Sequence, residues 1–295
     1  MSDIDSEIDL NVSTGVAAGT LYVVATPIGN LGDLTPRAID TLASVSLIAA
    51  EDTRHSQRLM QHADISTPMI SLHDHNERQR VDQLVGKLRA GASIALISDA
   101  GTPLVSDPGF QLVRGCHEAG LRVSPVPGAC AAIAALSAAG LPSDRFTFEG
   151  FLPASTGARK KQLAALKREP RTMVFYESPH RIVSSLTDMV DVFGADRQAS
   201  VGREMTKRHE SVNVCTLSEL AARFADGHEP SKGEFVVMVS GADAGEAATD
   251  VDSERLLTLL LAELPPSKAV KLAVKLTGQP RAALYALAQE MSASQ

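Results

Sequence analysis

The stretch IALISDAGTPLVSDPG, residues 94–109, decides how this chain is expected to fold. Its first four residues form an apolar run typical of a buried strand, and the Asp, Gly and Pro residues that follow favour tight turns. In parallel α/β sheets, ligands bind outside the carboxyl ends of the strands. An acidic residue such as Asp99 in that place can hold a hydroxyl or an ammonium group. Residues 98–109 are therefore expected to form part of a ligand site.

Two further strand-like runs end in turns of the same kind. TPIGN, residues 26–30, follows an apolar run, and PVPG, residues 125–128, follows another. Three such turns predict one composite pocket at the carboxyl edge of a sheet, although an ordinary connection is an equal alternative for any single turn. The sequence has no GxxxxGK[ST] and no GxGxxG that opens a helix, which argues against a P-loop nucleotidase and a Rossmann dehydrogenase.

The first part of the chain, residues 19–132, alternates between strand and helix patterns. This alternation predicts a parallel-rich sheet with helices on its faces. A run of small residues, 129–139, predicts a helix that packs as a core element or as a pocket wall. Strands are expected at 21–25, 45–50, 69–72 and 94–98, and helices after Thr35-Pro36, around 56–61 and at 77–90.

The second part, residues 133–241, predicts another α/β unit with a mixed sheet. Short connections between its last strands indicate an antiparallel portion. A linker is expected at 242–252, followed at 253–295 by three helices that resemble a helix-turn-helix unit. Residues 1–18 are acidic and lack a periodic apolar face, so they are expected to form a disordered tail. The strands of the second unit are expected at 145–151, 172–177, 199–203, 211–216 and 235–240.

The composition is that of a globular protein with two domains of ordinary size. The chain has 295 residues, 44% of them hydrophobic, and a net charge of −7. Three cysteines without a CxxC pair indicate neither a disulfide framework nor a zinc ribbon. The N-terminus has neither a basic segment nor a long apolar run, which predicts a cytoplasmic location without a membrane span.

A negative net charge at first argues against nucleic-acid binding, because affinity for nucleic acids depends on neutralising phosphates. However, nine of the 35 acidic residues lie in the tail and around the linker. The other 26 acidic residues nearly balance the 28 basic residues, so the rest of the chain is close to neutral. Basic side chains gather in residues 159–171 and 203–209 and on the C-terminal helices, at Lys268, Lys271, Lys275 and Arg281. These clusters predict phosphate contacts, with solvated helix faces or a packing appendage as the alternatives.

Six segments together are similar to one known family. They are LYVVATPIGNL at 21–31, EDTR at 51–54, the stretch 98–109, GFLP at 150–153, YESPHR at 176–181 and GEFV at 233–236. The chain resembles, from about Gly19 to its end, the ribosomal RNA small subunit methyltransferase I family of the tetrapyrrole-methylase superfamily. The resemblance implies a two-domain α/β fold with a helical extension. It also implies S-adenosylmethionine as cofactor, no metal, and 2′-O-methylation of the ribose of cytidine 1402 in 16S ribosomal RNA.

The same resemblance implies a site between the two domains and names its residues. The cofactor walls it implies are Pro27, Asp99, Thr102, Ala129, Cys130, Tyr176, Glu177, Gly233 and Glu234. A general base, if one acts, is sought among Glu51, Asp52 and Glu204, which could equally only orient arginines. The candidates for RNA phosphate contacts are Arg54, His180, Arg181, Arg203 and Lys207.

The implied partners are 16S ribosomal RNA, within a small ribosomal subunit or its precursor, and a second copy of the chain. Two alternatives stay open. A methyltransferase of cobalamin or sirohaem precursors shares the fold and the cofactor, and a non-enzymatic nucleic-acid-binding regulator uses the C-terminal helices alone.

Overall fold

The computed structural model describes residues 15–73, 76–242 and 253–293. The tail predicted at 1–18 lies outside them up to residue 14, and the predicted linker lies outside them from residue 243 to 252. Val16 already packs against the core of the first domain, and the Ala17 amide donates to Tyr22 Oη over 2.8 Å. The prediction of a disordered tail is therefore wrong for Val16 and Ala17, which contact the first domain.

The first sheet contains five strands in the order β3-β2-β4-β1-β5, and every neighbouring pair is parallel. All four residues of its central strand β4 are buried, as expected for a parallel strand covered on both faces. The parallel-rich sheet predicted for the first unit is confirmed. Its strands are β1 (Thr20–Val24), β2 (Leu47–Ala50), β3 (Met69–Ser71), β4 (Ile94–Ile97) and β5 (Arg122–Val126).

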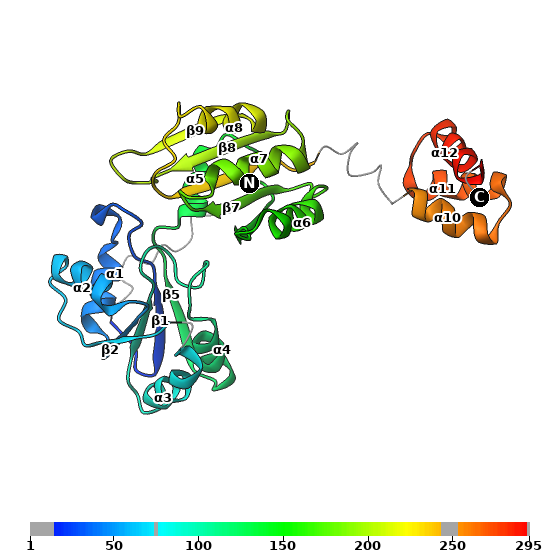
Figure 1. The fold of residues 1–295 in the computed structure, drawn as a ribbon. Coiled ribbons are helices and arrows are strands. Elements are labelled where there is room, and N and C mark those ends of the chain that lie inside the picture. Colours follow the sequence, from blue (N-terminus) through cyan, green and yellow to red (C-terminus); the bar gives the residue numbers. More distant parts are fainter. Residues whose placement is uncertain (1–14, 74–75, 243–252, 294–295) are drawn as a thin grey trace, which may run out of the picture.

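Helices cover both faces of this sheet (Figure 1). Helices α1 (Pro36–Ser44) and α2 (Thr53–His62) pack on one face, and α3 (Glu77–Arg89) and α4 (Phe110–Glu118) pack on the other. Asp52 caps α2, because its side chain accepts a hydrogen bond from the Arg54 amide. The helix therefore begins at Thr53, three residues before the predicted start. A short 3₁₀ helix, η1 (Leu31–Asp33), lies between β1 and α1.

The second sheet has the order β6-β7-β10-β8-β9 and mixed directions. Strands β6 and β7 are parallel, and the three other neighbouring pairs are antiparallel. This arrangement confirms the predicted mixed sheet with an antiparallel portion. Its strands are β6 (Phe146–Phe151), β7 (Thr172–Glu177), β8 (Gln198–Arg203), β9 (Ser211–Thr216) and β10 (Phe235–Val239).

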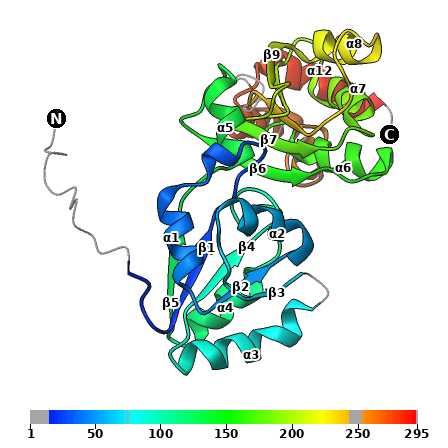
Figure 2. The ribbon, with the colours of Figure 1, turned by 90° about the vertical axis from the view of Figure 1, so that its left-hand side faces the viewer.

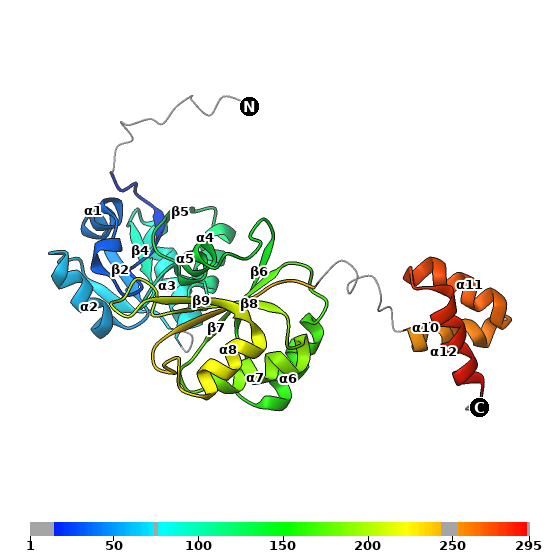
Figure 3. The same cartoon turned by 90° about the horizontal axis from the view of Figure 1, so that it is seen from above.

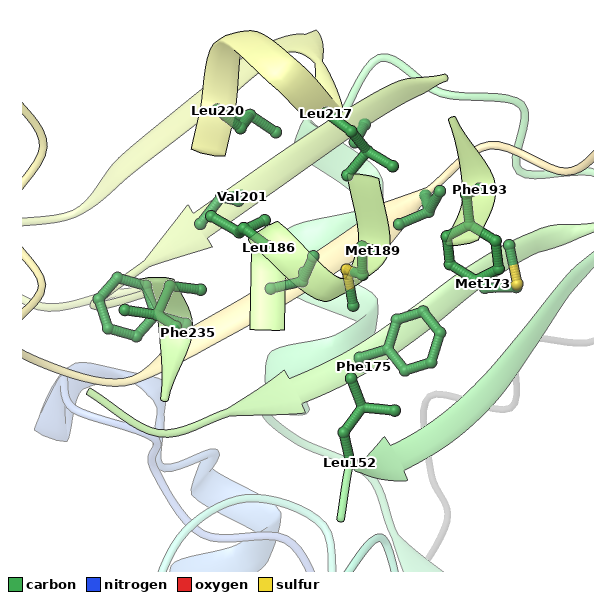
Figure 4. Close-up of a cluster of buried hydrophobic side chains, with 14 of the residues drawn as sticks. Leu152, Met173, Phe175, Leu186, Met189, Phe193, Val201, Leu217, Leu220 and Phe235 are labelled. Atoms are coloured by element: carbon green, nitrogen blue, oxygen red, sulfur yellow. The ribbon is translucent and has the colours of Figure 1, made fainter. Parts of the chain in front are cut away.

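The two faces of the second sheet carry different helices. Helices α6 (Thr156–Leu166), α7 (Ile182–Phe193) and α8 (Leu217–Ala225) lie side by side on one face (Figure 3). Their apolar side chains meet those of β7, β8 and β10 in a large core cluster (Figure 4). Helix α5 (Ala131–Ala138) covers the opposite face, and its small residues let it lie close to β7 and β10 (Figure 2).

The last three helices, α10 (Ser253–Glu263), α11 (Pro266–Thr277) and α12 (Arg281–Ala293), enclose a core of their own. Gly278 ends α11 in the left-handed conformation, at φ 69°, which glycine adopts without steric cost. The helical extension predicted from the sequence is confirmed. Its buried residues include Leu257, Val270, Ala273, Leu284 and Ala288. Over the described residues, the helices are too short or too polar to cross a bilayer.

Candidate functional site

A cavity of about 330 Å³ lies where loops of the first domain meet the second sheet. Ile28 comes from the turn after β1, and residues 100–102 and 105–107 come from the loop after β4. Cys130 and Ala131 follow the third predicted turn, at the start of α5. The structure thus brings the three turns together at one cavity, whose far wall is formed by the end of β7 and the start of β10.

Backbone hydrogen bonds hold these turns against each other. The Thr26 amide donates to Gly101 O over 2.8 Å, and the Gly101 amide donates back to Thr26 O over 3.1 Å. Gly101 has φ +81°, and a Cβ there would lie 3.2 Å from Ile28 Cγ2, so a glycine fits both the conformation and the space. Thr102 Oγ1 donates to Ala129 O over 3.0 Å and so ties the second turn to the third.

The cavity walls are mainly apolar, with acidic groups among them. Ile28, Val105 and Met205 contribute apolar surface, as do Phe151 and Val236. Asp107, Glu177 and Glu234 also line it, and the described lining residues include no Lys, Arg or His. The carboxylates of Glu177 and Glu234 are paired with Arg181 and Lys207, just outside the lining. Such a lining suits a ligand with an apolar body and a positive charge. Among the residues that the structure describes, no group of three or more His, Cys, Asp and Glu side chains is placed to hold a metal ion.

Tyr176 forms the centre of the second-domain wall. Its ring lies edge-on to those of Phe148, at 4.9 Å between centroids, and Phe151, at 5.5 Å. Its hydroxyl oxygen accepts a hydrogen bond of 3.2 Å from the Ala132 amide in the first turn of α5. Burial, more than any other effect, raises the pKa of the Tyr176 phenol well above its usual value. The phenol therefore remains neutral at physiological pH and links β7 to α5.

The predicted cofactor residues fall into two groups. Thr102, Cys130, Tyr176, Glu177 and Glu234 line the cavity. Pro27, Asp99, Ala129 and Gly233 are next to lining residues along the chain. Asp99 Oδ1 accepts a hydrogen bond of 3.1 Å from the Asp52 amide and so supports the start of α2. A direct contact of Asp99 with a cofactor stays a prediction.

Glu177 is buried and its carboxylate is held by protein groups. Its Oε2 accepts a hydrogen bond of 2.6 Å from Ser185 Oγ, and its Oε1 accepts one of 2.7 Å from the Ser178 amide. Arg181 Nη2 lies 2.9 Å from the same Oε1. These bonds fix the backbone after β7, where Ser178 and Pro179 line the cavity.

The three candidate bases lie near the cavity edge, outside its described lining residues. Glu51 Oε2 accepts a hydrogen bond of 3.3 Å from the Asp99 amide, and Asp52 caps α2. Glu204 Oε1 accepts hydrogen bonds from the Glu234 amide, at 2.9 Å, and from Lys207 Nζ, at 3.0 Å. Burial raises the pKa of Glu204, but these two hydrogen bonds outweigh it, so the pKa lies below its usual value. Glu204 is consequently an ionised partner of Lys207.

The candidates for RNA contacts differ in whether their side chains already form hydrogen bonds or ion pairs within the protein. The side chains of Arg54 and His180 are exposed and form no hydrogen bond or ion pair with other described residues. Arg181 Nη1 donates to Leu152 O over 3.0 Å in addition to its contact with Glu177. Arg203 donates to backbone carbonyls, including Lys232 O at 2.7 Å.

Lys207 joins the two domains. Its Nζ lies 3.0 Å from Glu204 Oε1 and 2.9 Å from Glu234 Oε2. Its aliphatic chain passes so close to Gly29 that a Cβ on that glycine would lie 2.3 Å from Lys207 Cγ. Gly29 belongs to the turn after β1, so the Lys207 side chain, from the second domain, packs against the first domain.

The interpretation of residues 159–171 as one exposed basic surface is wrong for its first member. Arg159 is only 1% exposed, and its Nη2 lies 2.6 Å from Asp188 Oδ2 of α7. Lys160 pairs with Asp191 at 2.6 Å, and Arg171 Nε pairs with Glu169 at the same distance. The basic residues of this segment are partly used to pack α6 against α7, a contact that charge counting along the sequence does not show.

Several lining residues were missed by motif reasoning. Ile28 and Asp107 lie inside quoted segments, and the segments themselves were the available signal. Val236 also lies inside a quoted segment, and it reaches the cavity because alternate residues of β10 face opposite sides of the sheet. Met205 lies in the turn after β8, where no strand pattern indicates which way a side chain faces.

Comparison with known families and relatives agrees with this geometry. A family model for Tetrapyrrole (Corrin/Porphyrin) Methylases matches residues 20–221, and one for an RsmI C-terminal HTH domain matches residues 247–292. A relative from Pseudomonas aeruginosa, "Ribosomal RNA small subunit methyltransferase I", is 54% identical over 92% of this chain and 96% of its own length. A relative of the same name from Escherichia coli O157:H7 is 52% identical over 92% of this chain and 95% of its own.

Solved structures with lower sequence identity share the fold. The methyltransferase CobJ superposes with a TM-score of 0.55 at 20% identity, over 76% of this chain and 95% of its own. A uroporphyrin-III-C-methyltransferase from Thermus thermophilus gives a TM-score of 0.52 at 20% identity, over 75% and 94%. Diphthine synthase gives 0.56 at 13% identity, over 75% and 89%.

Proposed function

Because the chain belongs to the ribosomal RNA small subunit methyltransferase I family of tetrapyrrole methylases, we propose that it methylates the 2′-hydroxyl of cytidine 1402 in 16S ribosomal RNA. S-adenosylmethionine is the proposed methyl donor. The RNA is taken within a small ribosomal subunit or its precursor, by a homodimer in the cytoplasm. The observation that carries the proposal is the largely apolar cavity, with Asp107 in its wall, in a chain with more than 50% identity to proteins of that name.

The residues of the cavity fit the proposed cofactor. Its volume of about 330 Å³ falls within the range of roughly 300–1,000 Å³ usual for small-molecule sites. S-adenosylmethionine carries positive charge on its sulfur and its amino group. Asp107 provides an acidic residue in the wall, while Ile28 and Val236 provide apolar surface for uncharged parts.

When bound, the cofactor supplies a methyl group on a positively charged sulfur, ready for displacement. The protein's contribution is mainly placement, which is worth up to about 7–11 kcal/mol in well-oriented reactions. The hydrogen bonds between Thr26 and Gly101 and between Thr102 and Ala129 fix the loops that form one wall. Phe151 and Met205 add apolar surface that keeps water from the reacting groups.

The 2′-hydroxyl loses a proton as it accepts the methyl group. Glu51 and Asp52 lie at the carboxyl edge of the first sheet and remain the proposed candidates to accept it. Glu204 is the weakest candidate, since Lys207 and the Glu234 amide stabilise its ionised form and lower its pKa. A carboxylate with a lowered pKa has less driving force to take a proton.

The contacts also divide the proposed RNA-binding residues. Arg54 and His180 have exposed side chains available for phosphates. Arg181, Arg203 and Lys207 are already hydrogen-bonded to protein groups, so we propose that they chiefly position the loops around the cavity.

Methyl mapping of small-subunit RNA tests the substrate. RNA from cells that lack this protein should have no 2′-O-methyl group at cytidine 1402, and the purified protein with S-adenosylmethionine should restore it. Persistence of the modification in those cells would refute the assignment. Methylation of a tetrapyrrole precursor instead of RNA would favour the alternative enzyme.

A substitution in the cavity tests the cofactor site separately. Asp107→Asn removes one negative charge from the wall without changing its shape. It should weaken binding of the cationic S-adenosylmethionine more than binding of S-adenosylhomocysteine, whose sulfur is neutral. Calorimetric titration of both ligands measures this difference, and equal effects on the two would remove Asp107 from the neighbourhood of the sulfonium. Lys232→Gln, at an exposed position, serves as the control.

A further inference from the structure

Helix α2 turns a basic face to solvent. Ser56 and Met60 are buried toward the first sheet, whereas Arg54, Arg58 and Gln61 are exposed at intervals of four and three residues. Residues three and four apart lie on the same side of a helix. His55 and His62 are exposed beside them. The α2 basic face is defined here as Arg54, His55, Arg58, Gln61 and His62.

The arginine charges of this face do not help the helix to form. Arg54 lies in the first turn, where the helix dipole disfavours a positive charge. Arg54 and Arg58 form a like-charged i,i+4 pair, which is also unfavourable, and α2 contains no acidic residue between Thr53 and His62. Neither guanidinium forms a hydrogen bond or ion pair with another described residue. An arrangement that opposes local stability is typical of a functional surface.

The α2 basic face begins close to the cavity. Helix α2 follows β2 at the carboxyl edge of the first sheet, and the Asp52 amide before it donates to Asp99 Oδ1 over 3.1 Å. The residues immediately after Asp99, at positions 100–102, line the cavity. From there the ten residues of α2 run about 15 Å along the surface of the first domain (Figure 1).

We propose that the α2 basic face binds the phosphate backbone of the RNA strand that presents the target ribose to the cavity. The inference rests on the proposed function. An arginine guanidinium can donate two parallel hydrogen bonds to one phosphate, and two arginines one helical turn apart provide two such sites. Contacts of this kind set the position of the strand without reading its bases. The strand thus runs over α2 and delivers the ribose at the helix start.

The test compares two double variants that remove the same number of charges. Arg54→Gln with Arg58→Gln alters the α2 basic face. Arg78→Gln with Arg89→Gln is the control, because these exposed arginines lie on α3, on the opposite face of the first sheet. The probe is a 16S RNA fragment that contains the target cytidine, and its dissociation constant is measured over a range of salt concentrations.

The α2 variant should bind this fragment more weakly, and its salt slope should fall by about 1.4, since each phosphate contact to a single strand contributes about 0.7. The control should keep the wild-type slope. The melting temperature of the α2 variant should not fall, because the substitutions relieve repulsion within the helix. An unchanged salt slope would overturn the inference, as would an equal fall in the control.

Methyl transfer by the wild-type protein separates this inference from the proposed function. Wild-type methylation of the RNA, together with an unchanged slope in the α2 variant, would leave the function standing and refute the role of α2. A slope that depends on α2 in a protein that does not methylate the RNA would support the α2 basic face and refute the function.

Discussion

Removal of the Arg159 guanidinium should destabilise the second domain severely. Arg159 and Asp188 are buried partners with side chains 2% and 6% exposed, and Arg159 also donates to the carbonyls of Pro153 and Ala154. Arg159→Met leaves the Asp188 carboxylate buried with Lys160 Nζ, 3.5 Å from its Oδ1, as the remaining cation. Breaking a buried pair from one side costs about 3–5 kcal/mol, and at about 2–4 °C per kcal/mol the melting temperature should fall by roughly 6–20 °C.

Urea denaturation followed by circular dichroism measures this loss. Lys161→Met is the matched control, because Lys161 is exposed on the same helix and should change stability by no more than about 0.5 kcal/mol. Arg159→Met combined with Asp188→Leu should recover much of the loss, since an apolar pair replaces a buried ionic one at little cost. Equal stability of Arg159→Met and Lys161→Met would refute the buried-pair reasoning. A selective loss of RNA affinity in a fully stable Arg159→Met protein would restore the phosphate-binding interpretation.

Three other outcomes are expected. Tyr176→Phe should leave the Ala132 amide without its acceptor, at a cost of about 1–3 kcal/mol, and loosen the start of α5. Calorimetry should then show at least about fivefold weaker S-adenosylmethionine binding. Unchanged affinity would contradict this prediction. Glu204 has a lowered pKa, so its stabilising effect is present above its unfolded pKa of about 4.3 and is lost as the pH falls through the folded value. The stability difference between wild type and Glu204→Gln should therefore be fully present at pH 7, begin to shrink below about pH 4.3, and be lost once the pH falls below the lowered folded pKa. Denaturation curves over this pH range measure it, and a difference independent of pH would exclude the carboxylate as its source. Deletion of residues 253–295, whose helices have their own core, should leave cofactor binding intact and reduce methylation of ribosomal substrate, whereas loss of cofactor binding would make these helices part of the main fold.

The fold was largely predictable because its signals are local. Four-residue apolar runs such as Ile94–Ile97 and the Thr35-Pro36 helix start depend on neighbours along the chain. The beginning of α2 was placed too late, because a capping side chain, Asp52, determines it rather than apolar periodicity. The order of the strands and the choice of face for each helix depend on distant contacts and needed the structure.

The site was predictable only in part, for the same physical reason. The three turns could be recognised because Gly and Pro mark them, and parallel strands bring their carboxyl ends to one edge. The partners of charged side chains could not be predicted. Arg159 finds Asp188 on another helix, and Lys207 is held by Glu234 from a loop 27 residues away. A charge that looks available in the sequence is thus often neutralised by a residue that only folding brings near.

The separation of charges in the structure explains how a chain with a net charge of −7 can combine a cationic cofactor with an anionic substrate. Asp107 lines the cavity, whose described lining residues include no Lys, Arg or His, so the wall favours a sulfonium over a phosphate. The exposed arginines Arg54 and Arg58 lie outside the cavity on α2. In the proposed path of the RNA over α2, uncharged groups such as a ribose hydroxyl can approach the cavity without bringing a phosphate next to Asp107. The charge pattern therefore favours methylation of a sugar hydroxyl over entry of the phosphate backbone, and reversal of either charge set should impair the RNA reaction.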